Sequence, residues 1–459
     1  MQFLKNIYKI SPPPLQNLYV SSFGIYWHWA RLKGEYKRHL ASFRQREWFT
    51  SQEWSHFQNQ ELKKILSVCL EYVPYYQNIW TKAQIQAAKK GDLPSLPILD
   101  KSPLRQHPGQ FRRLDKSHFP KHIFHTSGTT GTPIETQFSL SELRASLALR
   151  EVRSANWAGV SFNQPRATFS GRIVEPKVER ETHIYRYNLI EKQVYFSTFH
   201  LKSSTATLYV DAIRKFNIVW MTGYASAFYL LARFILNQKL KIPKLKAIIT
   251  TSEKLTPAMR KIMEKAYGCP IFEEYSTVEN ALFASECEEG RLHVSPDVSI
   301  VEILRPDGSP CEPGEVGEVV TTCLMRSYQP LVRFRLGDLA AWDPEPCPCG
   351  RQMPVIKEVV GRIEDVVTCP DGRQLVRFHG IFVNQPNIIE GQIIQENLDR
   401  FIVKVVTTEN FNVGDIEEIK RRMAQRLCSN IHVEVEEVNK IPRSKSGKFQ
   451  AVISNVNKP

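Results

Sequence analysis

Residues 125–133 read His-Thr-Ser-Gly-Thr-Thr-Gly-Thr-Pro, a run whose glycines and hydroxyls could bind phosphate. Gly128 and Gly131 disfavour a helix, because glycine in a helix interior costs about 1 kcal/mol relative to alanine. In a loop, the glycines let backbone N–H groups approach phosphate oxygens closely, and the hydroxyls add further donors. A surface linker can have the same composition, so the run alone leaves both interpretations open. It is not a Walker A loop, since it contains no Gly-Lys-Ser/Thr.

In its order of residues the run resembles the phosphate loop of the adenylate-forming superfamily, which contains acyl-CoA synthetases, adenylation domains and luciferases. The resemblance implies that the phosphates of ATP are bound by Thr126, Ser127, Gly128, Thr129, Thr130 and Gly131. That loop usually has a lysine next to its proline, whereas Thr132 and Ile134 flank Pro133 here. We therefore expect backbone donors, hydroxyls and a metal ion to neutralise the phosphate charge.

Residues 272–279, Phe-Glu-Glu-Tyr-Ser-Thr-Val-Glu, resemble the Tyr-Gly-x-Thr-Glu segment of the same family. The resemblance implies that Tyr275 lies against the adenine and that Glu279 holds Mg²⁺, a hard cation that prefers carboxylate and phosphate oxygen. Ser276 replaces the family's glycine and Val278 replaces its hydroxyl residue, which removes one phosphate contact. Taken alone, Glu279 is explained more simply as a carboxylate at a helix N-terminus.

Four further segments match the family in the same order along the chain. Residues 250–253 resemble the turn that lines the adenine, 334–338 the ribose-binding segment, 361–365 the hinge, and 442–448 the C-terminal lysine loop. They imply nucleotide binding by Ser252, Glu253, Asp338 and Arg362, a pivot at Glu364, and catalysis by Lys448. The 272–279 segment adds Glu274 to the nucleotide-binding residues that the resemblance implies. The ammonium of Lys448 would stabilise negative charge while a carboxylate attacks the α-phosphate. Singly, these segments are also consistent with an ordinary strand–helix loop, a Gly-Asp turn and a basic tail.

Cys347-Pro348-Cys349-Gly350-Arg351 holds two closely spaced thiols of the kind that often binds zinc. Two more ligands could fold back onto this pair from the segment after residue 279. The resulting set, Cys287, His293, Cys347 and Cys349, would complete a closed tetrahedral structural Zn²⁺ site. The alternative is three small buried cysteines beside a hydrogen-bonded histidine.

The Cys-x-Cys-Gly-Arg sequence, the Val-Pro-Tyr-Tyr at 73–76 and the compact C-terminal segment resemble the phenylacetate–CoA ligase branch, including its capsule-biosynthesis members. This branch implies that ATP and a carboxylic acid, in first place an aryl or arylacetic acid, give an acyl-adenylate, and that a thiol such as CoA then displaces AMP. It also implies an acyl pocket near Phe199, His200 and Tyr224. The alternatives are acyl transfer to a carrier protein or an amine, an adenylyltransferase that stops after the first step, and a non-catalytic member acting in polysaccharide assembly.

The elements that must position these residues form an α/β pattern. The 459 residues are enough for two or three domains, and 42% hydrophobic residues allow a sizeable core. Short β-rich runs, such as 218–221 and 247–250, alternate with helical ones from about 120 to 360. We expect a large multi-layered α/β core over residues 1–361, with a mostly helical leader at 1–95, and a small mobile α+β domain at 362–459.

The formal net charge of +14 favours an acidic partner, such as a nucleotide, CoA or an anionic membrane face. Residues 1–50 hold eight Lys/Arg against Glu35 and Glu47, with Trp27, Trp29 and Tyr36 among them. A helix in weak contact with a membrane surface is one interpretation, and a helix that packs these rings on the core is the other. Nine scattered cysteines and the lack of an apolar leader predict a cytoplasmic protein. The sequence contains no recognition module for nucleic acid.

Overall fold

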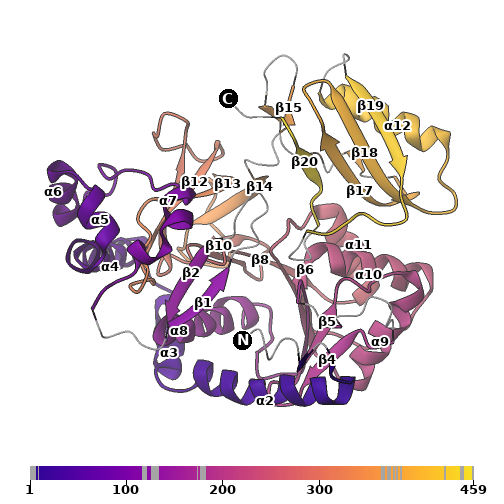
Figure 1. The fold of residues 1–459 in the computed structure, drawn as a ribbon, viewed down its shortest axis with the longest axis horizontal. Coiled ribbons are helices and arrows are strands. Elements are labelled where there is room, and N and C mark those ends of the chain that lie inside the picture. The colour runs from indigo at the N-terminus through magenta and orange to yellow at the C-terminus, as the bar shows by residue number, and fades with distance from the viewer. Residues whose placement is uncertain are drawn as a thin grey trace.

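The computed structural model describes residues 7–8, 10–115, 121–125, 134–172, 174–175, 182–362, 367–369, 374–375, 378, 381–382, 385–427, 431–444 and 449–456. Figure 1 shows a large lobe built around one sheet and a separate C-terminal domain with its own sheet. The predicted fold class, a large α/β core followed by a small α+β domain, is confirmed.

Residues 10–106 are largely helical. The helices are α2 (Pro13–Leu32), α3 (Tyr36–Arg46), α4 (Ser51–Tyr72), α5 (Pro74–Ile79), α6 (Lys82–Lys90) and α7 (Lys101–Gln106). The side chain of Thr50 accepts a hydrogen bond from the Glu53 amide and so caps α4. Because a residue before proline avoids the helical region, α4 ends before Val73, and Pro74 opens the next helix.

The large lobe contains a twelve-stranded sheet in the order β11-β12-β13-β14-β10-β9-β8-β7-β6-β3-β5-β4. The strands are β3 (Arg166–Ser170), β4 (Tyr185–Asn188), β5 (Gln193–Ser197), β6 (Trp220–Tyr224), β7 (Ala247–Thr251), β8 (Ile271–Ser276), β9 (Phe283–Glu286), β10 (Leu292–Val294), β11 (Ser299–Leu304), β12 (Val316–Cys323), β13 (Phe334–Trp342) and β14 (Val355–Arg362). Five adjacent strands, in the order β5-β3-β6-β7-β8, pair in parallel, and the remaining pairs of this sheet are antiparallel. A separate pair joins β1 (Lys121–His125) to β2 (Glu135–Ser139).

Helices of the parallel half are α8 (Leu140–Arg150), α9 (Ala206–Lys215), α10 (Ala225–Asn237) and α11 (Pro257–Tyr267). The predicted parallel strands are β6 and β7, and Thr256 caps α11 by accepting a hydrogen bond from Met259 N at 3.2 Å, also as expected. At Gly223 in β6, φ is +147° and a Cβ would lie 1.9 Å from the Phe169 carbonyl oxygen. Only glycine fits there, so β6 can approach β3 closely.

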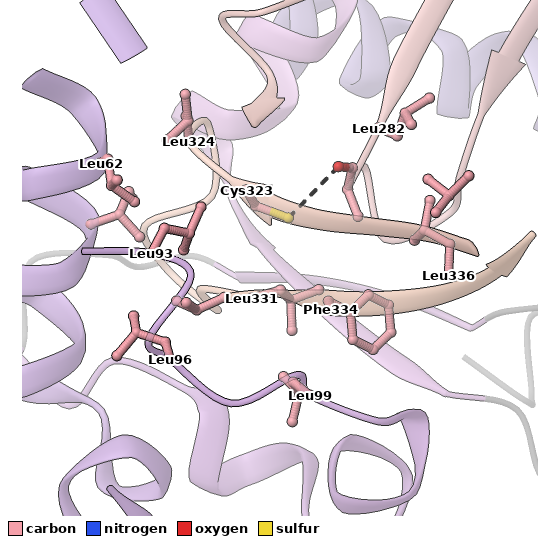
Figure 2. Packing of buried hydrophobic residues seen from close by; sticks show 14 of the residues in the cluster. Leu62, Leu93, Leu96, Leu99, Leu282, Cys323, Leu324, Leu331, Phe334 and Leu336 are labelled. Atoms are coloured by element: carbon pink, nitrogen blue, oxygen red, sulfur yellow. Dashed lines mark hydrogen bonds between the residues drawn. The ribbon is translucent and has the colours of Figure 1, made fainter. Parts of the chain in front are cut away.

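The part of the leader from α4 onward packs against the antiparallel half of the sheet (Figure 2). Leu62 of α4 and the following Leu93, Leu96 and Leu99 share a buried cluster with Leu331, Phe334 and Leu336. The backbone of Leu99 also pairs with β13, because Leu99 N donates to Arg333 O at 2.8 Å and Arg335 N donates to Leu99 O at 3.0 Å. The leader therefore supports β13, the strand that carries Asp338.

The C-terminal domain is an α+β unit. Its four-stranded sheet has the order β19-β18-β17-β20, with β17 (Ile388–Gln395), β18 (Arg400–Thr407), β19 (His432–Glu437) and β20 (Val452–Ser454), and α12 (Val413–Arg426) lies beside it. A short pair, β15 (Val367–Thr368) and β16 (Gln374–Leu375), precedes them. The buried cluster of this domain draws only on residues from Val367 onward. Among the described helices of the chain, none is long and apolar enough to cross a membrane.

Candidate active site

A cavity of about 1060 Å³ lies between the large lobe and the C-terminal domain. It opens at the carboxyl ends of β7 and β8, the edge at which parallel α/β sheets usually bind ligands. Six of the residues predicted to form the nucleotide site line it: Ser252, Glu253, Glu274, Tyr275, Glu279 and Asp338. The fold therefore brings together residues that are up to 86 positions apart in sequence (338 − 252).

Tyr275 and Asp338 form a direct contact in this cavity. The Tyr275 hydroxyl donates a hydrogen bond to Asp338 Oδ2 at 2.7 Å. Asp338 is only 6% exposed, and its backbone pairs with that of Arg362 across β13 and β14. The Arg362 side chain lies outside the described residues. The Tyr275–Asp338 pair places an aromatic ring and a carboxylate side by side, which suits a base and a ribose.

Glu274 and Glu279 differ in their surroundings. Glu274 is buried and accepts a hydrogen bond from Arg150 Nε at 3.1 Å. Glu279 is 7% exposed and follows β8, and its backbone oxygen accepts a hydrogen bond from Arg326 Nη1 at 2.5 Å. The Glu279 carboxylate is a hard oxygen donor beside a cavity of nucleotide size, which fits a Mg²⁺ ion shared with phosphate.

Cations that sequence reasoning missed also line the cavity: Lys101, Arg105, Arg150 and Lys254. The sequence led us to expect that backbone donors, hydroxyls, a metal ion and Lys448 neutralise the phosphate charge, and these four cations add to that set. Arg150 is the last residue of α8, and nothing in its local sequence distinguishes it from a solvated helix-end arginine. Only the packing of α8 beside β8 reveals its position.

Glu253 forms hydrogen bonds with both the large lobe and the C-terminal domain. Its carboxylate accepts hydrogen bonds from the amide of Ser226, at the start of α10, and from the amide of Phe449, in the C-terminal domain, each at 2.8 Å. Burial raises the pKa of Glu253 above its usual value, while the two amides oppose that shift. The adjacent Ser252 has a left-handed backbone, with φ of +69°, which turns the chain sharply after β7.

The predicted phosphate loop, Thr126–Gly131, lies outside the described residues, as do Glu364 and Lys448. Their described neighbours are informative. Phe124 and Ile134, on either side of the loop, line the cavity, and so do Phe449 and Gln450, which follow Lys448. The described residues on either side of the loop and those that follow Lys448 therefore line the same cavity.

The residues expected at an acyl pocket are not among those that line the cavity. The Phe199 carbonyl accepts a hydrogen bond from Lys440 Nζ at 3.2 Å, His200 Nδ1 lies 2.7 Å from Ser197 Oγ, and Tyr224 is buried at the end of β6. The apolar part of the cavity wall comes instead from other elements, including Phe124, Phe138, Leu143 and Phe283.

The proposed metal ligands do come together, away from the cavity. One donor atom from each of Cys287, His293, Cys347 and Cys349 lies within 4.8 Å of the others. The two thiols of Cys287 and Cys347 are 3.7 Å apart, and Cys349 Sγ lies 3.4 Å from His293 Nε2. Four ligands at zinc distances of about 2.3 Å in a tetrahedron would be separated by about 3.8 Å, so the set fits Zn²⁺.

The second nitrogen of His293 supports the same interpretation. Its Nδ1 lies 3.2 Å from the Met353 carbonyl oxygen and, when protonated, donates to it. This contact leaves the lone pair of Nε2 directed toward the thiols, as in histidines that bind zinc.

Comparisons with known proteins agree with this geometry. A family model described as the CapK C-terminal domain matches residues 371–455. The chain is 25% identical to Protein CapK of Staphylococcus aureus over 466 aligned positions, which cover 99% of this chain and 100% of that protein. It is 23% identical to Phenylacetate-coenzyme A ligase of Thermus thermophilus, over 86% of this chain and 95% of the ligase.

Among solved structures, 2-hydroxyisobutyryl-CoA ligase in its postadenylation state matches with a TM-score of 0.70 at 19% identity, over 90% of this chain and 92% of that one. The same ligase in its thioesterification state, over the same shares, gives 0.56 at 20% identity.

Proposed function

Since the chain belongs to the adenylate-forming superfamily, in the branch of the phenylacetate–CoA ligases and CapK, we propose that it activates a carboxylic acid with ATP to an acyl-adenylate and then transfers the acyl group to CoA. In the first step a carboxylate oxygen of the acid attacks the α-phosphate, and pyrophosphate leaves. In the second step the CoA thiolate attacks the acyl carbon, and AMP leaves.

The proposal rests on one observation, which is that the candidate residues line the same cavity. Tyr275, Asp338 and Glu279 line it, and so do the described neighbours of both the 126–131 loop and Lys448. A cavity with these residues can hold a base, a ribose and a triphosphate at once. The division into domains at 361/362 also suits the reaction, because residues 362–459 would turn as a lid between the two steps.

We assign the roles by chemistry. Tyr275 and Asp338 orient the nucleoside, Arg150 and Lys101 offset phosphate charge, and Lys448 stabilises the charge that develops on the α-phosphate. Glu279 would hold Mg²⁺, which supplies further neutralisation of the phosphates. The Cys₃His cluster would hold a structural Zn²⁺ that takes no part in the reaction.

The acid is proposed to be aryl or arylacetic. The aromatic wall of Phe124, Phe138 and Phe283 offers flat apolar surface for such a ring. Acyl transfer to a carrier protein or an amine, or an adenylyltransferase without a second step, would use the same first step, so the acceptor is decided by experiment.

The test is pyrophosphate release from ATP with a panel of carboxylic acids, with and without CoA. Release without CoA supports adenylation, and CoA-dependent AMP formation supports the ligase. Lys448→Ala should abolish pyrophosphate release, while Lys445→Ala, in the same loop and with the same loss of charge, should not. Absence of nucleotide turnover with every acid would favour a non-catalytic role, which the Val278 departure also suggests.

A further inference from the structure

Helix α2 directs an apolar face outward. Its exposed residues include Leu15, Leu18, Tyr19, Phe23, Ile25, Tyr26 and Trp29, with Phe23 58% and Trp29 56% exposed. Most of them are spaced three or four residues apart, so they lie along one side of the helix. A surface helix of a globular protein normally buries such a side and exposes polar residues. The expectation that the rings of this region pack on the core is therefore wrong for Trp29.

The inward side of α2 is polar and closely fitted, which fixes the rotation of the helix. Buried Gln16 accepts a hydrogen bond from Arg186 Nε at 2.7 Å and donates one to Tyr8 O at 2.7 Å. Gly24 lies so close to Asn188 that a Cβ would come within 2.4 Å of its Oδ1. Turning the apolar side inward would break these contacts, so the outward face is a built feature of the fold.

The apolar surface continues beyond the helix. Leu189 and Ile190, in the turn between β4 and β5, are 64% and 39% exposed. The turn is attached to α2 because Leu189 N donates a hydrogen bond to Ser21 Oγ at 3.2 Å.

Positive charge borders this surface. Helix α2 contains no acidic residue, and Lys33, Lys37 and Arg38 beyond its C-terminal end are exposed. Within the described ranges none of these three cations forms an ion pair, whereas the acids nearby do: Glu35 pairs with Arg144 and Glu191 with Arg31 and Arg166. The region therefore has an excess of positive charge.

We propose that α2 and the β4–β5 turn dock this protein on a lipid bilayer that contains anionic lipid, with the helix lying in the plane of the interface. Tyr and Trp rings prefer the boundary between headgroups and acyl chains, and basic residues next to them attract anionic headgroups. The exposed apolar side chains form a line along an outer helix, and such a line can contact the flat surface of a bilayer along its whole length. Because α2 lies on the side of the large lobe away from the C-terminal domain (Figure 1), docking leaves the cavity and the lid free.

The test is co-sedimentation of the full chain with vesicles of phosphatidylcholine alone or with added phosphatidylglycerol. We expect binding that requires phosphatidylglycerol and weakens when salt is raised from about 0.1 M to about 0.5 M. Replacing Phe23, Tyr26 and Trp29 together by Gln should reduce the partition coefficient at least about tenfold. The matched control replaces three exposed apolar residues on other faces by Gln: Ile79, Leu398 and Val413.

Thermal melting and pyrophosphate release should be unchanged in both triple variants, which shows that they fold. Equal binding of the α2 variant and the native chain would overturn the proposal, and so would failure of the native chain to bind anionic vesicles. If light scattering instead shows that the native chain is a dimer and the α2 variant a monomer, without vesicle binding, the face is a protein–protein interface and the proposal is wrong.

Discussion

Glu253 offers the sharpest test of how the lid is held for the first half-reaction. Its carboxylate accepts the amide of Phe449, the residue after the proposed catalytic lysine, as well as the amide of Ser226 in the large lobe. The two contacts hold Phe449, and with it the C-terminal domain, beside the cavity. We predict that Glu253→Gln slows acyl-adenylate formation and leaves thioester formation unchanged, because the proposed rotation of the lid would break this contact between the two steps.

The magnitude follows from the two hydrogen bonds. A hydrogen bond to a charged group contributes about 1.5–3 kcal/mol and one between neutral groups about 0.5–1.5 kcal/mol. Only the bond to Phe449 joins the two domains, because Ser226 lies in the same lobe as Glu253. Glutamine has one acceptor oxygen for two amides, and where its NH₂ group faces Phe449 the bond between the domains is lost. The docked lid should lose about 1.5–3 kcal/mol, which reduces its population, and with it the rate of pyrophosphate release, by about 10- to 150-fold.

The two half-reactions are assayed separately. Pyrophosphate release from ATP and the preferred acid measures the first, and AMP formation from preformed acyl-adenylate and CoA measures the second. Glu315→Gln is the matched control, since Glu315 lies in a turn of the large lobe, is held by Arg305, and is remote from the lid. Its rates should equal those of the native protein.

The pH dependence gives a second readout of the same residue. Burial raises the pKa of Glu253, so the carboxylate gains its proton at a higher pH than an ordinary glutamate and then accepts hydrogen bonds more weakly. Pyrophosphate release should therefore fall as the pH drops through that raised pKa, and Glu253→Gln should lack this loss. A folded variant that releases pyrophosphate at the native rate, or one that loses both half-reactions equally, would refute this role of Glu253.

Three further predictions concern the nucleoside contact, the metal and the core. Tyr275→Phe removes the donor to Asp338 and should raise the KM for ATP about tenfold, while Tyr187→Phe should not; an unchanged KM would show that the hydroxyl does not position the carboxylate. Zinc analysis should find one ion per chain, and Cys347→Ser should lower both that content and the melting temperature; less than one zinc per native chain would remove the metal proposal. Asp297→Asn leaves buried Arg153 without its charged partner and should lower the free energy of unfolding, measured in urea, by about 3–5 kcal/mol. A loss below about 1 kcal/mol would contradict a stabilising role for the Arg153–Asp297 ion pair.

The parts of the site that the sequence predicts are those encoded in short segments. Tyr275 and Glu279 lie in one run and Asp338 in another, and each run resembles a segment of the adenylate-forming family. The Cys₃His set was also predictable, because few cysteines can pair with a Cys-x-Cys turn. In these cases the chemistry is local, and the fold only has to bring the segments together.

The rest depends on contacts between distant residues. The position of the cavity cation Arg150 depends on its contact with Glu274, which is 124 positions away in the sequence. The apolar wall of the cavity likewise comes from elements other than those around Phe199 and His200. The outward face of α2 could not be predicted from amphipathicity, since its orientation depends on Gln16 meeting Arg186, 170 positions later. Periodicity tells which residues share a side of a helix, but not which side a polar partner will bury.

The closed core of the C-terminal domain has a consequence for engineering. Because its buried cluster contains no side chain from the large lobe, the domain can be exchanged between relatives as one piece, provided that the contact of Ile389 with the buried cluster around α10 is kept. What a chimera must preserve is a small set of polar docking contacts, such as Phe449 with Glu253 and Lys440 with the Phe199 carbonyl. Acceptor preference and acid preference can then be varied independently, by grafting one body while keeping the other.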